Sequence, residues 1–149
     1  SGGRPQGRDV IGRGLAAALA LAAACDRAPP VRSCDDDLTG VWRGPAGAWQ
    51  LVTTARGREL YPIERELPAD LPPGVIAAPA TIELPRAGAG AFVRRYERGA
   101  RFCRMTGPAR LTACGGGRLT LEVAPPPPPA DWDRCVGAAA APRPLTLTR

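Results

Sequence analysis

Five cysteines and the absence of histidine set the first limits on the chemistry of this chain. The cysteines are Cys25, Cys34, Cys103, Cys114 and Cys135, and no two of them form a Cys-x-x-Cys pair. Zinc sites usually combine closely spaced cysteines or add histidine to them, so we expect no metal ion. The lack of histidine excludes catalysis by a histidine base or by a serine–histidine pair. We therefore expect neither an enzyme active site nor a cofactor.

Four of the cysteines are suited to form two disulfide bonds if the chain leaves the cytosol. Small exported domains are commonly stabilised in this way, and four cysteines allow three connectivities. We favour Cys103–Cys114, across an expected turn within residues 105–112, together with Cys34–Cys135. By loop entropy these bridges would contribute roughly 3 kcal/mol and roughly 4 to 5 kcal/mol, respectively.

The fifth cysteine follows an apolar run near the start of the chain. Residues 15–24 are all leucine or alanine, and this ten-residue run is preceded by three arginines. It has about half the length that a bilayer-spanning helix needs. Alanines occupy the minus-three and minus-one positions before Cys25. This layout is typical of a secretory signal peptide, so we predict a signal helix in residues 1–24 that is removed on export.

The sequence "LAAAC" at residues 21–25 resembles a bacterial lipobox. The resemblance implies that Cys25 becomes the new N-terminus and carries fatty acyl chains such as palmitate. Ala22 departs from the pattern, which usually has a larger aliphatic residue at this position. Two alternatives stay open: cleavage before Cys25 without lipid attachment, and an alanine-rich helix that is retained. Residues 25–37 contain few apolar side chains and a Pro-Pro pair, so we expect a lipidated tether there.

Beyond the tether, apolar residues recur at every second position, which is the period of a half-buried strand. Leu119, Leu121 and Val123 alternate with polar residues, and residues 80–84 repeat the pattern. No helix is expected after residue 30. Expected turns lie at Gly57, Gly99, Gly107-Pro108 and Gly115–Gly117, and a stiff polyproline excursion lies at Pro125–Pro129. We predict that residues 38–149 form one all-β domain, a small antiparallel β-barrel or sandwich of about eight strands in meander order.

The two ends of this domain carry a second resemblance. Gly40 and Trp42 lie in the first expected strand, and Leu145, Leu147 and Arg149 share one face of the last. In a closed barrel these strands pair, so the guanidinium would stack over the indole. A Gly-x-Trp with a late arginine resembles the signature of the lipocalins and the wider calycin group. It implies a barrel whose mouth binds a ligand at Trp42 and Arg149. The alternative is that Trp42 is a core plug and Arg149 a solvated residue.

Arginine is the basic residue throughout the chain, and the formal net charge is +6. Arg94, Arg95 and Arg98 lie on one expected hairpin and form a candidate anion site. The alternative is that they are surface charges, because adjacent residues on a strand point to opposite faces. We interpret the acidic groups in the same way, as surface charges rather than calcium ligands or an acid–base pair. They are Asp35–Asp37, Glu64 with Glu66, and Asp131 with Asp133.

These patterns predict an exported lipoprotein of the bacterial cell envelope. Because the chain has only two phenylalanines and two tyrosines, we expect a mostly filled barrel that acts as a structural or protein-interaction module. The alternative is the binding of a small apolar or amphipathic ligand at the barrel mouth. Expected partners are the membrane, through the lipid anchor, and another envelope protein, an anionic lipid or a cell-wall polymer. Nucleic acid is not expected to be a partner of an exported chain.

Overall fold

The fold is taken from a computed structural model, which describes Gly3, residues 30–64, Pro68 and residues 70–149. The predicted signal peptide, apart from Gly3, and the candidate lipidation site Cys25 lie outside these residues. Within them the chain forms strands and no helix, and none of their segments is a helix long and apolar enough to cross a membrane. The strands are β1 (Gly40–Gly44), β2 (Gly47–Thr53), β3 (Gly57–Pro62), β4 (Val75–Ala77), β5 (Thr81–Pro85), β6 (Gly90–Arg98), β7 (Arg101–Gly115), β8 (Arg118–Val123) and β9 (Arg143–Thr148).

Eight of these strands close into an antiparallel barrel, and β4 is the additional one. The strand order is β4-β6-β5-β3-β2-β1-β9-β8-β7, and the pairing of β6 with β7 completes the ring. β1 joins β9 at Arg43 opposite Thr148, so the first and last barrel strands are neighbours. The prediction of an all-β antiparallel barrel with about eight strands is confirmed, and the sandwich alternative is not.

Most of the expected turns are present, and one is not. Gly57, Gly99, Gly116 and Gly117 have positive φ angles of 149°, 59°, 57° and 71° and join successive strands as predicted. The turn expected at Gly107-Pro108 is wrong, because β7 runs through both residues without interruption. Gly107 is needed there for a different reason. A Cβ at this position would collide with the backbone oxygen of Ala124, where another segment crosses the strand.

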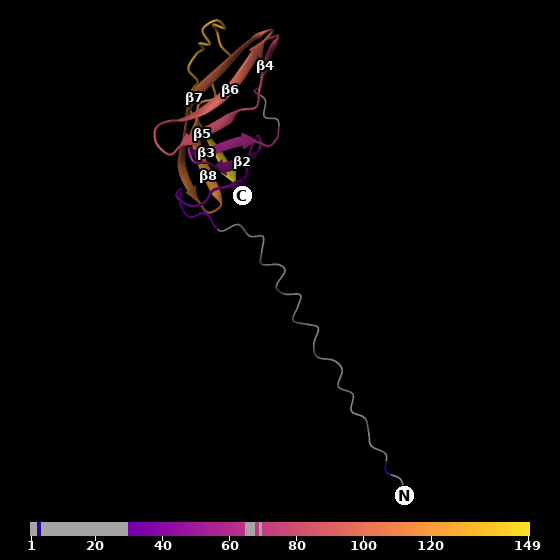
Figure 1. The fold of residues 1–149 in the computed structure, drawn as a ribbon, viewed down its shortest axis with the longest axis vertical. Coiled ribbons are helices and arrows are strands. Elements are labelled where there is room, and N and C mark those ends of the chain that lie inside the picture. The colour runs from indigo at the N-terminus through magenta and orange to yellow at the C-terminus, as the bar shows by residue number, and fades with distance from the viewer. Residues whose placement is uncertain (1–2, 4–29, 65–67, 69) are drawn as a thin grey trace.

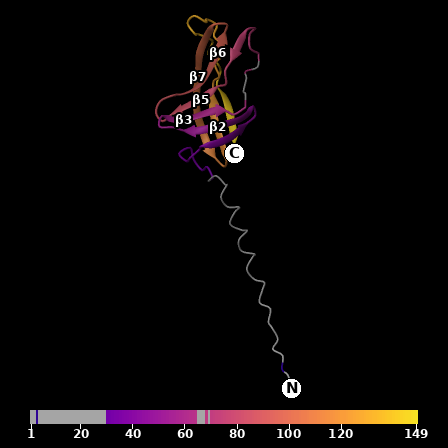
Figure 2. The same cartoon turned by 45° about the vertical axis from the view of Figure 1, so that its right-hand side comes forward.

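The buried side chains form two separate clusters. The first fills the barrel and includes Trp42, Trp49, Leu51, Leu60, Ile82, Phe92, Leu119, Leu121 and Leu147. The second contains Val75, Ala77, Tyr96, Cys103, Met105 and Trp132. Both views show that β6 and β7 continue beyond the rest of the barrel, with β4 beside β6 (Figures 1 and 2). The second cluster therefore lies in a distal extension, at the end of the molecule opposite the C-terminus.

Two disulfides join the four expected cysteines, but in a connectivity that differs from the favoured one. The bonds are Cys34–Cys114 and Cys103–Cys135, with S–S distances of 2.07 and 2.19 Å. The Cys34–Cys135 pairing was wrong, since each of these cysteines bonds to a cysteine of β7 instead. The Cys103–Cys114 pairing was wrong because both residues lie on β7. Eleven residues of extended strand (114 − 103 = 11) separate their Cα atoms by about 35 Å, far more than a disulfide spans.

Each disulfide fixes a segment that has no strand of its own. Cys34–Cys114 attaches the residues before β1 to the C-terminal half of β7, and Val31 is already buried in the barrel core. The second half of the expected tether is thus held against the barrel. Cys103–Cys135 attaches the long segment between β8 and β9 to the distal extension.

We predict that replacing either pair by serine destabilises the protein by an amount that follows the loop length. The sequence separations are 80 and 32 residues. Loop entropy gives roughly 4 to 5 kcal/mol for the longer loop and roughly 3 to 4 kcal/mol for the shorter one. Urea unfolding of the two double variants measures the loss. Peptide mapping without reduction should yield the same two pairs, and a Cys103–Cys114 peptide would contradict the structure.

Candidate functional site

At the C-terminal end of the barrel, the predicted stacking of Arg149 on Trp42 is formed. The guanidinium carbon of Arg149 lies 4.6 Å from the centre of the indole ring. Its Nη2 donates a hydrogen bond to the carbonyl of Thr39. Trp42 is fully buried, and its Nε1 donates to the carbonyl of Leu38 at 2.8 Å. The contact therefore covers the end of the core.

Gly40 is the residue type that this contact requires. Its φ of 136° lies in a region that side chains rarely adopt. A Cβ at this position would also lie 3.2 Å from Nη2 of Arg149. The Gly-x-Trp and the late arginine are thus parts of one packed cap.

The side chains that were expected to wall an interior cavity are buried in the barrel core. Trp49, Leu51, Ile82 and Leu121, which would wall an interior cavity, have relative exposures of 4%, 0%, 0% and 0%. They belong to a single cluster that also contains Trp42. None of the clefts described below is lined by these four residues. The clefts lie instead at the two ends of the barrel.

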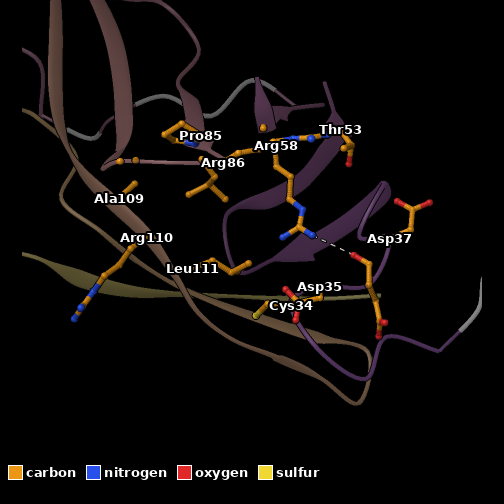
Figure 3. Close-up of a pocket in the computed structure, with 15 residues that line it drawn as sticks. Cys34, Asp35, Asp37, Thr53, Arg58, Pro85, Arg86, Ala109, Arg110 and Leu111 are labelled. Carbon is orange, nitrogen blue, oxygen red and sulfur yellow. Dashed lines mark hydrogen bonds between the residues drawn. The ribbon is translucent and has the colours of Figure 1, made fainter. Parts of the chain in front are cut away.

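The cleft beside the C-terminal end, with a volume of about 640 Å³, lies between Cys34–Asp37 and the turns that follow β2 and β5. Figure 3 shows Arg58 extending toward the Cys34–Asp37 segment, where its Nη2 donates to the carbonyl of Asp36 at 3.2 Å. Arg110 points away from Arg58 in the same view and is paired with Glu122 at 3.0 Å. Both arginines are therefore engaged with neighbouring parts of the chain, Arg58 with Asp36 and Arg110 with Glu122.

The acidic residues at this cleft shape the chain rather than form a cation site. Oδ2 of Asp36 accepts the amides of Arg32 and Ser33 at 2.6 and 3.0 Å, and these bonds lower the pKa of Asp36. The amide of Thr39 likewise lowers the pKa of Asp37. No group of three potential ligands that could hold a metal ion occurs among the described residues.

The candidate anion site on the β6–β7 hairpin is not assembled as one cluster. Arg94 is 2% exposed and lies over the Phe92 ring at 5.4 Å. Arg95 lies on the outer face, over the Phe102 ring at 4.8 Å and 2.8 Å from Glu97. Arg98 lies over Trp132 at 4.8 Å. The alternation of strand faces separates Arg95 from Arg94 and Arg98. Arg95 and Arg98 are exposed, as the surface-charge alternative expected, whereas the burial of Arg94 contradicts that alternative for this residue.

The other carboxylate pairs are only partly described. Glu66 lies outside the described residues, so the pair that it would form with Glu64 is not tested. Asp131 accepts the amides of Asp133 and Arg134, at 3.0 and 3.1 Å, and pairs with the Arg134 side chain. Asp133 pairs with Arg101. These contacts suit a loop-stabilising role for both aspartates.

A second cleft, of about 550 Å³, opens at the distal end of the barrel. One wall is the polyproline segment Pro125–Pro128, and the hydroxyl of Tyr96 donates to the carbonyl of Pro126 at 2.7 Å. Arg94 and Arg143 also line this cleft. Sequence reasoning treated the prolines only as an excursion. The burial of Pro126 and Pro129, three residues apart, matches the threefold repeat of a polyproline helix packed along one edge.

Comparison with known proteins found no matching family, no matching curated protein and no matching solved structure.

We predict that Arg149→Ala lowers the free energy of unfolding by about 1 to 2 kcal/mol, because it removes the cation–π contact and a hydrogen bond. Arg118→Ala is the matched control, since Arg118 is an exposed arginine on the neighbouring strand β8. Urea unfolding followed by tryptophan fluorescence measures both variants. Equal stability of the two would show that Arg149 is a solvated residue with no capping role.

Proposed function

We propose that this chain is an exported, lipid-anchored envelope protein that acts as a structural or protein-interaction module. The observation that carries the proposal is the filled barrel. Its interior is occupied by indole, phenyl and aliphatic side chains, so the outer surface is the place where a solid barrel of this kind would act. Arg149 covers the Trp42 ring at the end of the barrel, which supports a stable closed end more than an open ligand-binding end.

The two disulfides support export. Bonds of this kind persist in oxidising compartments and are rare in the cytosol. They use four of the five cysteines. Cys25 is the remaining one and is therefore available for lipid attachment. This agrees with the interpretation of residues 1–24 as a leader and of Cys25 as the lipidated residue.

The anchor would orient the barrel on the membrane. Val31 is packed in the core, which leaves residues 25–30 as the link. Six extended residues reach about 20 Å, so the C-terminal end would lie close to the bilayer and the distal extension would point away from it. The distal extension is therefore the surface best placed to meet another envelope protein.

We predict that Cys25→Ala moves the protein from the membrane fraction to the soluble exported fraction. The reason is that the thiol is the only attachment point for the acyl chains under this proposal. Fractionation of bacteria expressing the chain with its own leader, together with palmitate labelling, measures the change. Cys25→Ala protein that still partitions into membranes would contradict the anchor, and retention of the original chain in the cytosol would contradict export.

The alternative predicted that an amphipathic ligand binds at the barrel mouth near Trp42 and Arg149, but the observation that would support such a ligand lies in the distal cleft, which neither residue lines. Its proline and leucine walls and the guanidinium of Arg143 could accommodate an apolar chain with an anionic head. The alternative predicts saturable binding of dodecanoate in calorimetric titration, weakened by Arg143→Ala but not by Arg118→Ala. The filled-barrel module predicts no saturable binding, so the titration separates the two functions.

A further inference from the structure

The distal half of β7 has a neighbouring strand on one edge. Residues 101–109 pair with β6, whereas β8 pairs with β7 only from Ala109 onward. The register of β8 explains why the ladder stops. If it continued, Pro126 would lie opposite Thr106 and Pro128 opposite Arg104, and proline has no N–H to donate. The chain instead leaves β7 after Ala124, and Tyr96 binds the carbonyl of Pro126.

Strand alternation identifies the backbone groups on this second edge. The carbonyl of Pro108 accepts the amide of Ala124 at 2.9 Å, so it points away from β6. The backbone groups of Thr106 and Arg104, two and four residues earlier, point to the same side. Among the residues that the structure describes, no backbone hydrogen bond reaches them there. The Cys135 sulfur lies 3.8 Å from the Phe102 carbonyl and marks the far end of this edge.

We propose that this edge, Phe102–Thr106, binds an extended segment of a partner protein in antiparallel register. The segment would continue the line of β8, with main-chain hydrogen bonds to Arg104 and Thr106. The proposal rests on the proposed function as an interaction module, and it names the surface and the kind of partner.

The side chains along this edge favour a partner segment with an acidic residue opposite Arg104. The existing partner of Arg104 is Glu83 at 3.0 Å, and the two side chains are 58% and 44% exposed. Glu83 lies on β5, so Arg104 reaches across β6 in this pair and would have to turn toward the open edge to meet a carboxylate of the partner. An ion pair this exposed contributes little, so the exchange costs little. Phe102 is 65% exposed on the same face and offers contact to an apolar side chain.

A second copy of this chain fits the same edge less well. Two copies of β7 paired antiparallel about Arg104 would place one Arg104 directly opposite the other. Like charges opposite each other destabilise a sheet pair. In the register centred on Arg104, the charges therefore favour a different chain with acidic character over a second copy.

The test uses two synthetic peptides and the purified chain. In the first peptide valine, glutamate and leucine, separated by threonines, are placed to face Thr106, Arg104 and Phe102; in the second, lysine replaces glutamate. Thr106→Pro removes an edge N–H without removing a bond to β6 and should weaken binding of the first peptide about tenfold. Thr106→Ala is the matched control and should bind normally. Arg104→Glu should reverse the preference between the peptides.

Fluorescence anisotropy gives the affinities, and amide hydrogen exchange shows whether Arg104 and Thr106 become protected. Equal binding by the proline and alanine variants, or no binding of either peptide, would contradict the proposal that the edge Phe102–Thr106 binds an extended segment. Self-association that Thr106→Pro abolishes would assign the edge to a second copy and overturn the proposed partner. Membrane attachment through Cys25 without peptide binding would overturn only this inference. Peptide binding by a chain retained in the cytosol would overturn only the proposed function.

Discussion

Closure of the sheet through β1 and β9 is the constraint on which the rest of this structure depends. A sheet without a second layer to cover it buries one face by closing on itself, and here the closure includes a short contact, Arg43 with Thr148. Trp42 lies at that seam, fully buried, with its indole nitrogen bonded to Leu38 and its ring covered by Arg149. The stacking of Arg149 on Trp42 therefore adds a side-chain contact where β1 and β9 share a single backbone pair.

The distal extension follows from a second constraint, the absence of an N–H in proline. β8 ends where the prolines begin, and the segment that follows is held by Tyr96 and by the Cys103–Cys135 disulfide. This segment covers a second cluster around Met105 and Trp132. Among the described residues, the same departure leaves the distal half of β7 with a paired strand on one edge and none on the other. A feature that stabilises the second core thus also creates a surface suited to pairing with another chain.

The buried interior side chains and the open edge of β7 are the two features on which the proposed module function rests. Sheet edges are surfaces on which extended peptides gain main-chain hydrogen bonds. The arginines of the β6–β7 hairpin do not form one anion pocket; each covers an aromatic ring or pairs with a carboxylate.

The sequence by itself determined the all-β class, most of the turns and the set of bridged cysteines. It also predicted the contact between Trp42 and Arg149, but left open the alternative of a core plug beside a solvated arginine. These depend on local signals: side-chain alternation, glycines at positive φ, and the parity of residues on two strands that closure makes adjacent. Only the tertiary structure decided that Cys34 bonds to Cys114 and Cys103 to Cys135. Gly107-Pro108 has the composition of a turn, which led to the wrong pairing, but both residues lie inside β7. The glycine is needed there because the backbone of Ala124 passes too close for a Cβ. Disulfide partners depend on where whole strands run, and a two-residue pattern does not contain that information.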